Sequence, residues 1–252
     1  MTEGVLRARK QLDANVNNFM YRIKLTELKK QELKQTKEAL KKWENYREEN
    51  KNFEHEVDEP YKELVKIKLP WWYLTTQATR CTVCEENCHY PGCWWVSNLS
   101  KCSVMSEQGK CTVCTKKCLP TKHEKDDYIY EIKTKRVKRT KEDLKKKYEK
   151  EFRDKKKLET KLENEIKWEE AEKIRLVEEC YQCFEKLMET ALKSTSMSSI
   201  QHLDFMIEKM KETGKQERVL KLEELKRRAQ EENKGLIGRL CHQINVLWKD
   251  SA

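Results

Sequence analysis

One cysteine spacing occurs twice between residues 81 and 123. The pattern is Cys-Thr-Val-Cys-x3-Cys-x4-Cys starting at Cys81, and Cys-Thr-Val-Cys-x3-Cys-x4-His starting at Cys111. This window holds eight of the eleven cysteines and two of the five histidines. Cysteine in one copy and histidine in the other is a usual exchange between zinc ligands. The predicted ligands are Cys81, Cys84, Cys88, Cys93, Cys111, Cys114, Cys118 and His123.

Structural zinc explains this pattern better than sulfur redox chemistry. A disulfide framework needs an oxidising compartment, but the N-terminus lacks the apolar run of a secretory signal and the cysteine count is odd. A redox dithiol would need a thioredoxin-like βαβ unit, which the flanking sequence does not resemble. We therefore expect two tetrahedral zinc ions, one held by four cysteines and the other by three cysteines and a histidine.

The pairing of ligands with ions stays open at this point. Each copy can close its own site, or the copies can interleave as in cross-braced modules. Cys102 can replace Cys93, and His89 can replace a cysteine. Catalytic zinc is disfavoured because it needs an open coordination position and a general base. We expect no catalytic residue, and interpret three nearby carboxylates as solvated loop side chains: Glu85, Glu86 and Glu107.

The cysteine-rich window has too few apolar side chains to fold by burial alone. A segment of about 40 residues seldom does so. A structural zinc ion, in contrast, contributes roughly 10–16 kcal/mol of apparent binding free energy at neutral pH. The sequence therefore predicts that removing the metal unfolds this module.

The rest of the chain is typical of long helices. Charged residues make up 39% of the 252 residues, with only 6 glycines and 4 prolines. A heptad seam between residues 5 and 53 predicts a coiled-coil helix. Lys30 and Lys37 interrupt this seam, so we expect a partner helix with acids, which the stretch 163–172 of a second helix over about 140–193 can supply. The seam consists of Leu12, Val16, Phe19, Ile23, Thr26, Lys30, Leu33, Lys37 and Leu40.

Period-2 patterns on both sides of the zinc window predict a short two-stranded antiparallel ribbon. The alternating residues are Val65, Ile67 and Leu69 before the window and Tyr128, Tyr130 and Ile132 after it. The predicted fold class is mainly α: a long antiparallel helical coiled-coil stalk, a small zinc-stapled head with the ribbon at its base, and a C-terminal helical hairpin. The predicted segments are 1–57 (first stalk helix), 58–133 (ribbon and zinc module, core 81–123), 134–193 (second stalk helix) and 194–252 (short C-terminal helices).

Two further features have a structural and a functional interpretation. Residues 133–157 contain fourteen Lys or Arg and five Asp or Glu. This run can be a phosphate-binding face or a nuclear-import signal, or the solvated start of a helix that faces an acidic partner. We prefer the latter, because the basic residues are not interleaved with aromatic ones. Cys180-x2-Cys183 can be half of a metal site, but its helical context favours core packing, and His202 is interpreted as a surface or packing residue.

The cysteine pattern also supports a resemblance to a known group. The segment from Thr79 to Cys93, together with Cys102-Ser-Val-Met, Gly109-Lys-Cys-Thr-Val-Cys and His123, resembles the cysteine-rich coiled-coil tail of uncharacterised fish and fungal proteins related to immunity-associated GTPases. The similarity extends to Leu144–Tyr148, Gln201–Lys209 and Glu231–Gly235. In that group the tail follows a nucleotide-binding domain. This chain has no Gly-x4-Gly-Lys-Ser/Thr loop, so it reads as such a tail without the GTPase domain, either a shortened paralogue or part of a longer product.

These observations predict a non-enzymatic zinc-binding protein that acts as an interaction or assembly module. The expected partners are proteins or further copies of the chain, bound through the helices. The alternative is zinc-dependent nucleic-acid binding through the basic surface of residues 133–157. A ubiquitin ligase is excluded because only three residues separate Cys84 from Cys88. We expect no membrane span and no nucleotide site, and an intracellular location that is cytoplasmic in preference to nuclear.

Overall fold

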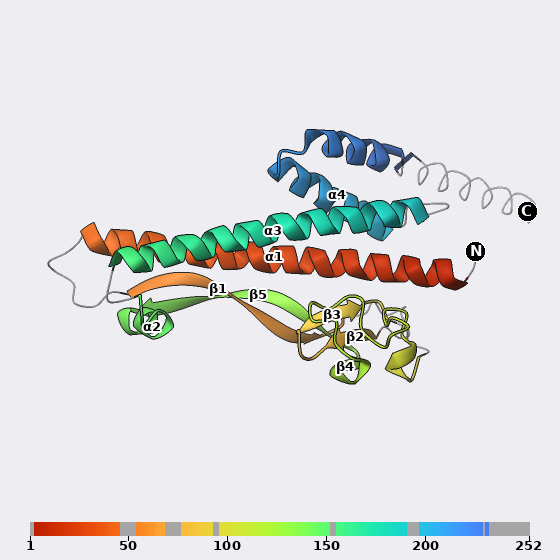
Figure 1. Ribbon diagram of the computed structural model, residues 1–252, viewed down its shortest axis with the longest axis horizontal. Helices are drawn as coiled ribbons and strands as arrows, with labels where there is room; N and C mark the ends of the chain where they lie inside the picture. Colours follow the sequence, from red (N-terminus) through yellow and green to blue (C-terminus); the bar gives the residue numbers. More distant parts are fainter. Residues whose placement is uncertain are drawn as a thin grey trace, which may run out of the picture.

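The computed structural model describes residues 3–45, 54–68, 77–92, 96–151, 155–190, 197–228 and 230–231. Two long helices lie side by side, with a two-stranded ribbon and a small cysteine-rich sheet on one side and a C-terminal helical hairpin on the other (Figure 1). Leu69 and Cys93, singled out above, lie outside the described residues.

Helices α1 (Glu3–Asn45) and α3 (Lys155–Thr190) form the antiparallel pair. Apolar seam residues of α1 such as Val16 and Ile23 are fully buried. Lys37 forms an ion pair with Glu163 at 2.5 Å, and Lys30 forms one with Glu170. The prediction that acids of the second helix face these lysines is confirmed. Partly exposed ion pairs contribute little stability, so their main effect is to set the register of the two helices.

Strands β1 (Glu54–Lys66) and β5 (Tyr128–Thr140) form a ribbon of 13 residue pairs, from Glu54 opposite Thr140 to Lys66 opposite Tyr128. The ribbon is much longer than predicted and runs back along α1 (Figure 1). Two hydrogen bonds dock it there: the Gln35 side-chain amide donates to Asp58 Oδ2 at 2.9 Å, and the Asp58 backbone N–H donates to Gln35 Oε1 at 2.8 Å.

The sequence predicted that the basic run over 133–157 is the start of a helix, and this prediction is wrong for its first residues. Residues 133–140 belong to strand β5. Its side chains pair with acids of β1: Lys135 and Arg139 lie 3.5 and 2.8 Å from carboxylate oxygens of Glu59, and Arg136 lies 3.5 Å from Asp58. Opposite charges across neighbouring strands stabilise an extended pairing. The acidic partner thus comes from β1, and the helical segments after it are α2 (Lys141–Lys147) and α3.

The cysteine-rich module contains a second sheet with strand order β3-β2-β4, in which β2 spans Ala78–Cys81, β3 Glu86–His89 and β4 His123–Asp126. Single 3-10 turns lie at Leu99–Lys101 (η1) and Pro120–Lys122 (η2). The module packs against the N-terminal half of α1, where Ala14 joins its buried cluster. The Arg7 guanidinium donates to the Met105 carbonyl at 2.6 Å, and the Gln11 side-chain amide donates to the Ser103 carbonyl at 2.7 Å.

The predicted fold class is therefore wrong. The described residues form a mixed α and β structure with two antiparallel sheets, and no long coiled-coil stalk with a head at its tip is present. The physical reason is that α1 offers contacts to β1, including the two hydrogen bonds between Gln35 and Asp58 and the packing of the Lys62 ammonium over the Tyr21 ring. Folding the ribbon back along α1 makes these contacts and places the cysteine-rich module beside the helix.

The largest apolar core lies where α4 (Met197–Glu212) and a helical segment over 216–228 pack on α1 and α3. Phe184 and Cys180 are fully buried there, and the Cys183 thiol donates to the Leu12 carbonyl at 3.6 Å. The interpretation of this cysteine pair as core is confirmed. His202 is also a packing residue, at 3% exposure. A separate cluster formed by α1, α2 and α3 includes Leu33, Leu40, Leu144, Tyr148, Leu158 and Leu162.

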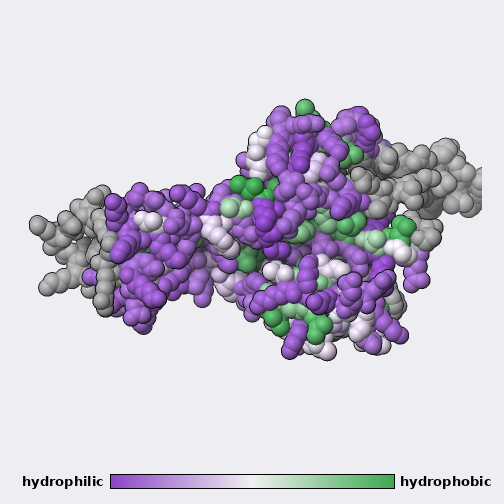
Figure 2. Space-filling model, viewed as in Figure 1, coloured by the Kyte–Doolittle hydropathy of each residue, from purple (hydrophilic) through white to green (hydrophobic). Residues whose placement is uncertain are grey.

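Hydrophilic side chains dominate the visible surface, and hydrophobic ones form smaller patches between them (Figure 2). None of the helices among the described residues has the length and apolar character needed to cross a bilayer.

We expect Phe184→Ala to lower the free energy of unfolding by about 3–5 kcal/mol, because it leaves a cavity in the core shared by α1, α3 and α4. Chemical denaturation followed by helical circular dichroism measures this change. Ile174→Ala, at a position of the same helix that is 47% exposed, is the matched control and should change the free energy by about 0.5 kcal/mol or less. Equal losses for both variants would contradict the assignment of this core.

Candidate metal centre

Two groups of four side chains in the cysteine-rich module can each hold a metal ion. The first group is Cys81, Cys84, Cys114 and Cys118, and the second is Cys88, Cys111, Cys114 and His123. Within each group the potential ligand atoms all lie within 4.8 Å of one another. Most of these side chains are buried, and Cys81 and Cys114 are fully so.

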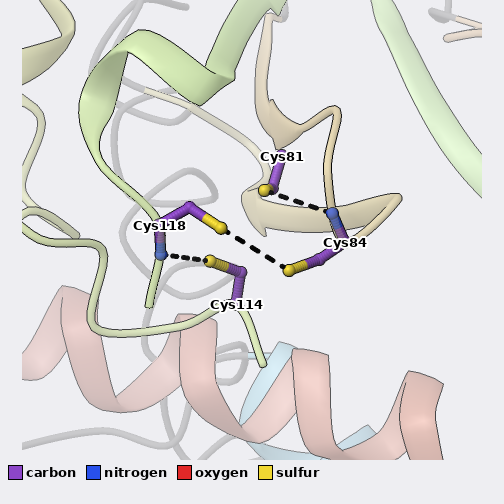
Figure 3. A group of neighbouring side chains, drawn as sticks. All are labelled: Cys81, Cys84, Cys114 and Cys118. Atoms are coloured by element: carbon purple, nitrogen blue, oxygen red, sulfur yellow. Dashed lines mark hydrogen bonds between the residues drawn. The ribbon is translucent and has the colours of Figure 1, made fainter. Parts of the chain in front are cut away.

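The first group joins two turns that are distant in sequence (Figure 3). Cys81 ends β2 and Cys84 lies in the turn that follows, whereas Cys114 ends the later Cys-x2-Cys pair and Cys118 lies four residues after it. The sulfurs of Cys84 and Cys118 are 3.8 Å apart. Sulfurs bound at about 2.3 Å to one tetrahedral ion are separated by about this distance, whereas a disulfide bond would bring them to about 2 Å. The geometry therefore fits shared coordination.

The second group includes a histidine whose orientation is set by the backbone. Nδ1 of His123 lies 2.9 Å from the Leu119 carbonyl, which holds the proton on this nitrogen. Nε2 is then the nitrogen left to bind an ion together with the sulfurs of Cys88, Cys111 and Cys114. This buried nitrogen makes no hydrogen bond. A histidine ligand typically donates one ring N–H to a carbonyl and keeps the other nitrogen free for the metal, and His123 has this arrangement at Nδ1 and Nε2.

Backbone amides surround the sulfurs and favour their anionic form. The Cys84 N–H donates to Cys81 Sγ at 3.4 Å, and the Cys118 N–H donates to Cys114 Sγ at 3.3 Å. Cys111 Sγ accepts from the N–H groups of Val113 and Cys114 at 3.4 and 3.5 Å. All of these contacts join residues two to four positions apart, so they follow from the local turns of the two cysteine repeats, and hydrogen bonds to coordinating sulfur orient the ligand and tune the metal.

The ionisable groups of the centre influence one another strongly. Burial raises the pKa of the Cys84 thiol to about 11. Contact with Cys111 raises the pKa of Cys88 and lowers that of Cys114. Burial lowers the pKa of His123, but contacts with Cys111 and Cys114 outweigh this effect and raise it to about 10. Because metal ligands must be deprotonated, binding of an ion here releases protons.

The predicted ligands do not form one site per copy. Seven of the eight lie in the two groups, and the third cysteine of each copy joins the Cys-x2-Cys pair of the other copy. The interleaved arrangement is therefore the one that the structure contains. The eighth, Cys93, lies outside the described residues. The alternates His89 and Cys102 belong to neither group: His89 Nδ1 lies 3.4 Å from Cys102 Sγ, and both side chains are buried.

Glu86 is a buried residue of the candidate centre whose contacts the sequence interpretation missed. It is only 5% exposed, so the prediction of a solvated carboxylate is wrong. Its Oε2 accepts from the Asn18 side-chain amide of α1 at 3.0 Å and from the Thr115 backbone N–H at 3.0 Å. Its Oε1 accepts from the Thr115 hydroxyl at 2.5 Å. One carboxylate therefore joins the first turn, the second turn and α1, and only the spatial proximity of Asn18 and Thr115 distinguishes it from the exposed Glu85.

Comparisons with protein-family models, curated proteins and solved structures found no match to this chain. They therefore do not bear on the resemblance to GTPase tails. The function assigned below rests on the residues and geometry of the metal centre.

We expect Glu86→Gln to lower the free energy of unfolding of the metal-loaded protein by about 1–3 kcal/mol, because an amide nitrogen in place of one carboxylate oxygen would face a donor and leave a buried polar group unpaired. Glu85→Gln, an adjacent and exposed position, is the control and should be close to neutral. Denaturant titration of both variants measures the difference. A neutral Glu86→Gln would show that this carboxylate does not join the module to α1.

Proposed function

We propose that the protein is a non-enzymatic zinc protein in which the metal is structural and orders an interaction module on a helical frame. The observation that carries this proposal is the convergence of sulfur and imidazole donors into two groups of four. Zn²⁺ prefers these donors in tetrahedral sets, and four protein ligands characterise structural sites rather than catalytic ones. The residues holding the ions would be those of the two groups.

The energetics of the module support a structural role. Cysteines provide much of its buried cluster, and Val104, Met105 and Val113 are among its few large apolar members. The sulfurs come from β2, from β3 and from turns outside the sheet, and a bound ion would hold these segments together. Metal coordination supplies folding free energy of the required size in small domains of this kind. The contacts of Arg7, Gln11 and Asn18 then attach the ordered module to α1.

We expect native mass spectrometry of protein purified without added metal to show two zinc ions per chain. Removal of the ions by a chelator should abolish amide protection in residues 78–126, because the remaining apolar contacts there are too few. The core of α1, α3 and α4 should keep its protection, since its buried residues include no ligand. Hydrogen exchange with mass spectrometry measures both regions together. Persistence of protection in 78–126 after complete metal removal would contradict a structural role.

An exposed tryptophan supports the interaction role. Trp168 on α3 is 63% exposed, and it borders a hollow that Leu33 and Lys29 also line. Tryptophan is enriched among the residues that dominate protein binding energies. The lysine-bearing seam of α1 is covered by α3 of the same chain through Lys30 and Lys37. Contact with a protein partner or a second copy would therefore use the exposed edge around Trp168, beside the hollow between α1 and α3, and not this seam.

We expect the wild-type chain to self-associate at micromolar concentration and Trp168→Ala to weaken this association at least tenfold, a loss of about 1.4 kcal/mol. The variant should unfold with nearly the wild-type free energy, because the side chain is mostly exposed. Sedimentation equilibrium and denaturant titration measure the two properties. Leu220→Ala, at a position 59% exposed on the C-terminal hairpin, is the control. A strictly monomeric wild-type mass would refute self-association.

The resemblance to the tails of immunity-associated GTPases fits this role. A tail of this kind would provide a metal-ordered surface for assembly, with nucleotide chemistry carried by another domain or chain. Nucleic-acid binding is less well supported, because Lys135, Arg136 and Arg139 of β5 pair with acids of β1. Flat titrations with DNA and RNA at low salt would agree with this preference, whereas binding that weakens steeply with salt would oppose it.

A further inference from the structure

The two ligand groups overlap at one residue. Cys114 belongs to both, and its sulfur lies within 4.8 Å of every other ligand atom in each group. We infer that the centre is a binuclear zinc cluster in which the Cys114 thiolate bridges the two ions. This inference rests on the proposed function, because it concerns the arrangement of ions in the same centre.

Counting the ligands supports a shared sulfur. Two tetrahedral ions need eight coordination positions, and the two groups contain seven different residues. Use of Cys114 by both ions supplies the eighth position. Among the described residues neither group contains a further donor, and His89 and Cys102 lie against each other in a separate pair. Within the described part of the chain, sharing is the arrangement that gives both ions four protein ligands.

The sheet register keeps the two groups adjacent. Cys81 of β2 is the direct partner of His123 of β4, so a ligand of the first group and a ligand of the second lie on neighbouring strands. Two ions bound to one sulfur at about 2.3 Å are at most about 4.6 Å apart. The strand pairing brings the sites together independently of the position of Cys114.

The Cys114 sulfur also has the surroundings that a bridge requires. It is fully buried and accepts a hydrogen bond from the Cys118 N–H at 3.3 Å. A thiolate has three lone pairs, so one remains for this amide while two bind ions. Sharing also reduces buried charge: six thiolates and two Zn²⁺ sum to −6 + 4 = −2, whereas the seven thiolates of separate sites would give −7 + 4 = −3. Burying less net charge costs less free energy.

Cadmium-113 NMR of the intact chain tests the bridge directly. Zinc is replaced by ¹¹³Cd, which binds the same donors, and proton–cadmium correlation spectra are recorded. We expect two cadmium resonances, with the β protons of Cys114 correlated to both and those of Cys81 correlated to one. Correlation of the Cys114 β protons with a single resonance would overturn the bridge while leaving the structural metal site in place. Absence of any bound zinc or cadmium would instead overturn the proposed function.

Matched alanine variants provide a second measurement. Cys114→Ala and Cys81→Ala each remove one buried sulfur, but only Cys114 belongs to both groups. Native mass spectrometry should show loss of both ions in Cys114→Ala and retention of one ion in Cys81→Ala. Retention of one tightly bound ion in Cys114→Ala would contradict a bridge. Should both variants fail to fold, the correlation spectra of the intact chain still decide between one and two bound ions at Cys114.

Discussion

The cysteine-rich module depends on bringing buried sulfurs from two turns to within coordination distance of one another. Thiol groups attract one another weakly. Without a shared cation, burial of so many of them in a small module would contribute little to the folding free energy. The sulfurs of Cys84 and Cys118 nevertheless lie 3.8 Å apart, and neither belongs to a disulfide. The β2–β4 pairing and the backbone amides that face the sulfurs all serve this convergence. A cation shared by the two groups of ligands would give all of these features one structural role.

Helix α1 connects this centre to the rest of the molecule. Three separate buried clusters include residues of α1: Ala14 in the cysteine-rich module, Val16 and Ile23 in the core with α4, and Leu33 and Leu40 in the cluster with α2. A helix that supplies several clusters has buried residues on several faces, not along a single stripe. This explains why one heptad seam described only part of its packing. It also places the candidate metal centre and the apolar core on one helix.

Charge complementarity determines where the polar elements lie. The lysines in the α1 seam face acids of α3, and the basic strand β5 faces acids of β1. Such pairs contribute little net stability when they are partly exposed, but the wrong register would place like charges together. They therefore select one arrangement among several that bury similar apolar area. The same pairing leaves the basic strand less available to phosphate groups than its sequence suggests.

The sequence by itself determined most of the donor residues of the candidate centre and the helical character of α1 and α3. Repeated spacing identifies ligands because a Cys-x2-Cys turn forms between residues close in sequence. A long run without glycine or proline likewise favours a helix through contacts between residues close in sequence. Acids facing Lys30 and Lys37 could be anticipated because charge complementarity needs only a partner of opposite sign.

Only the tertiary structure decided which ligands share an ion, because that depends on how two turns separated by thirty residues approach each other. Sharing of Cys114 between both groups has no local signature. The role of Glu86 depends on Asn18, which is 68 residues away. The strand conformation of residues 133–140 depends on acids in β1. Each of these features is a contact between distant parts of the chain, and local spacing and composition do not encode distance in space.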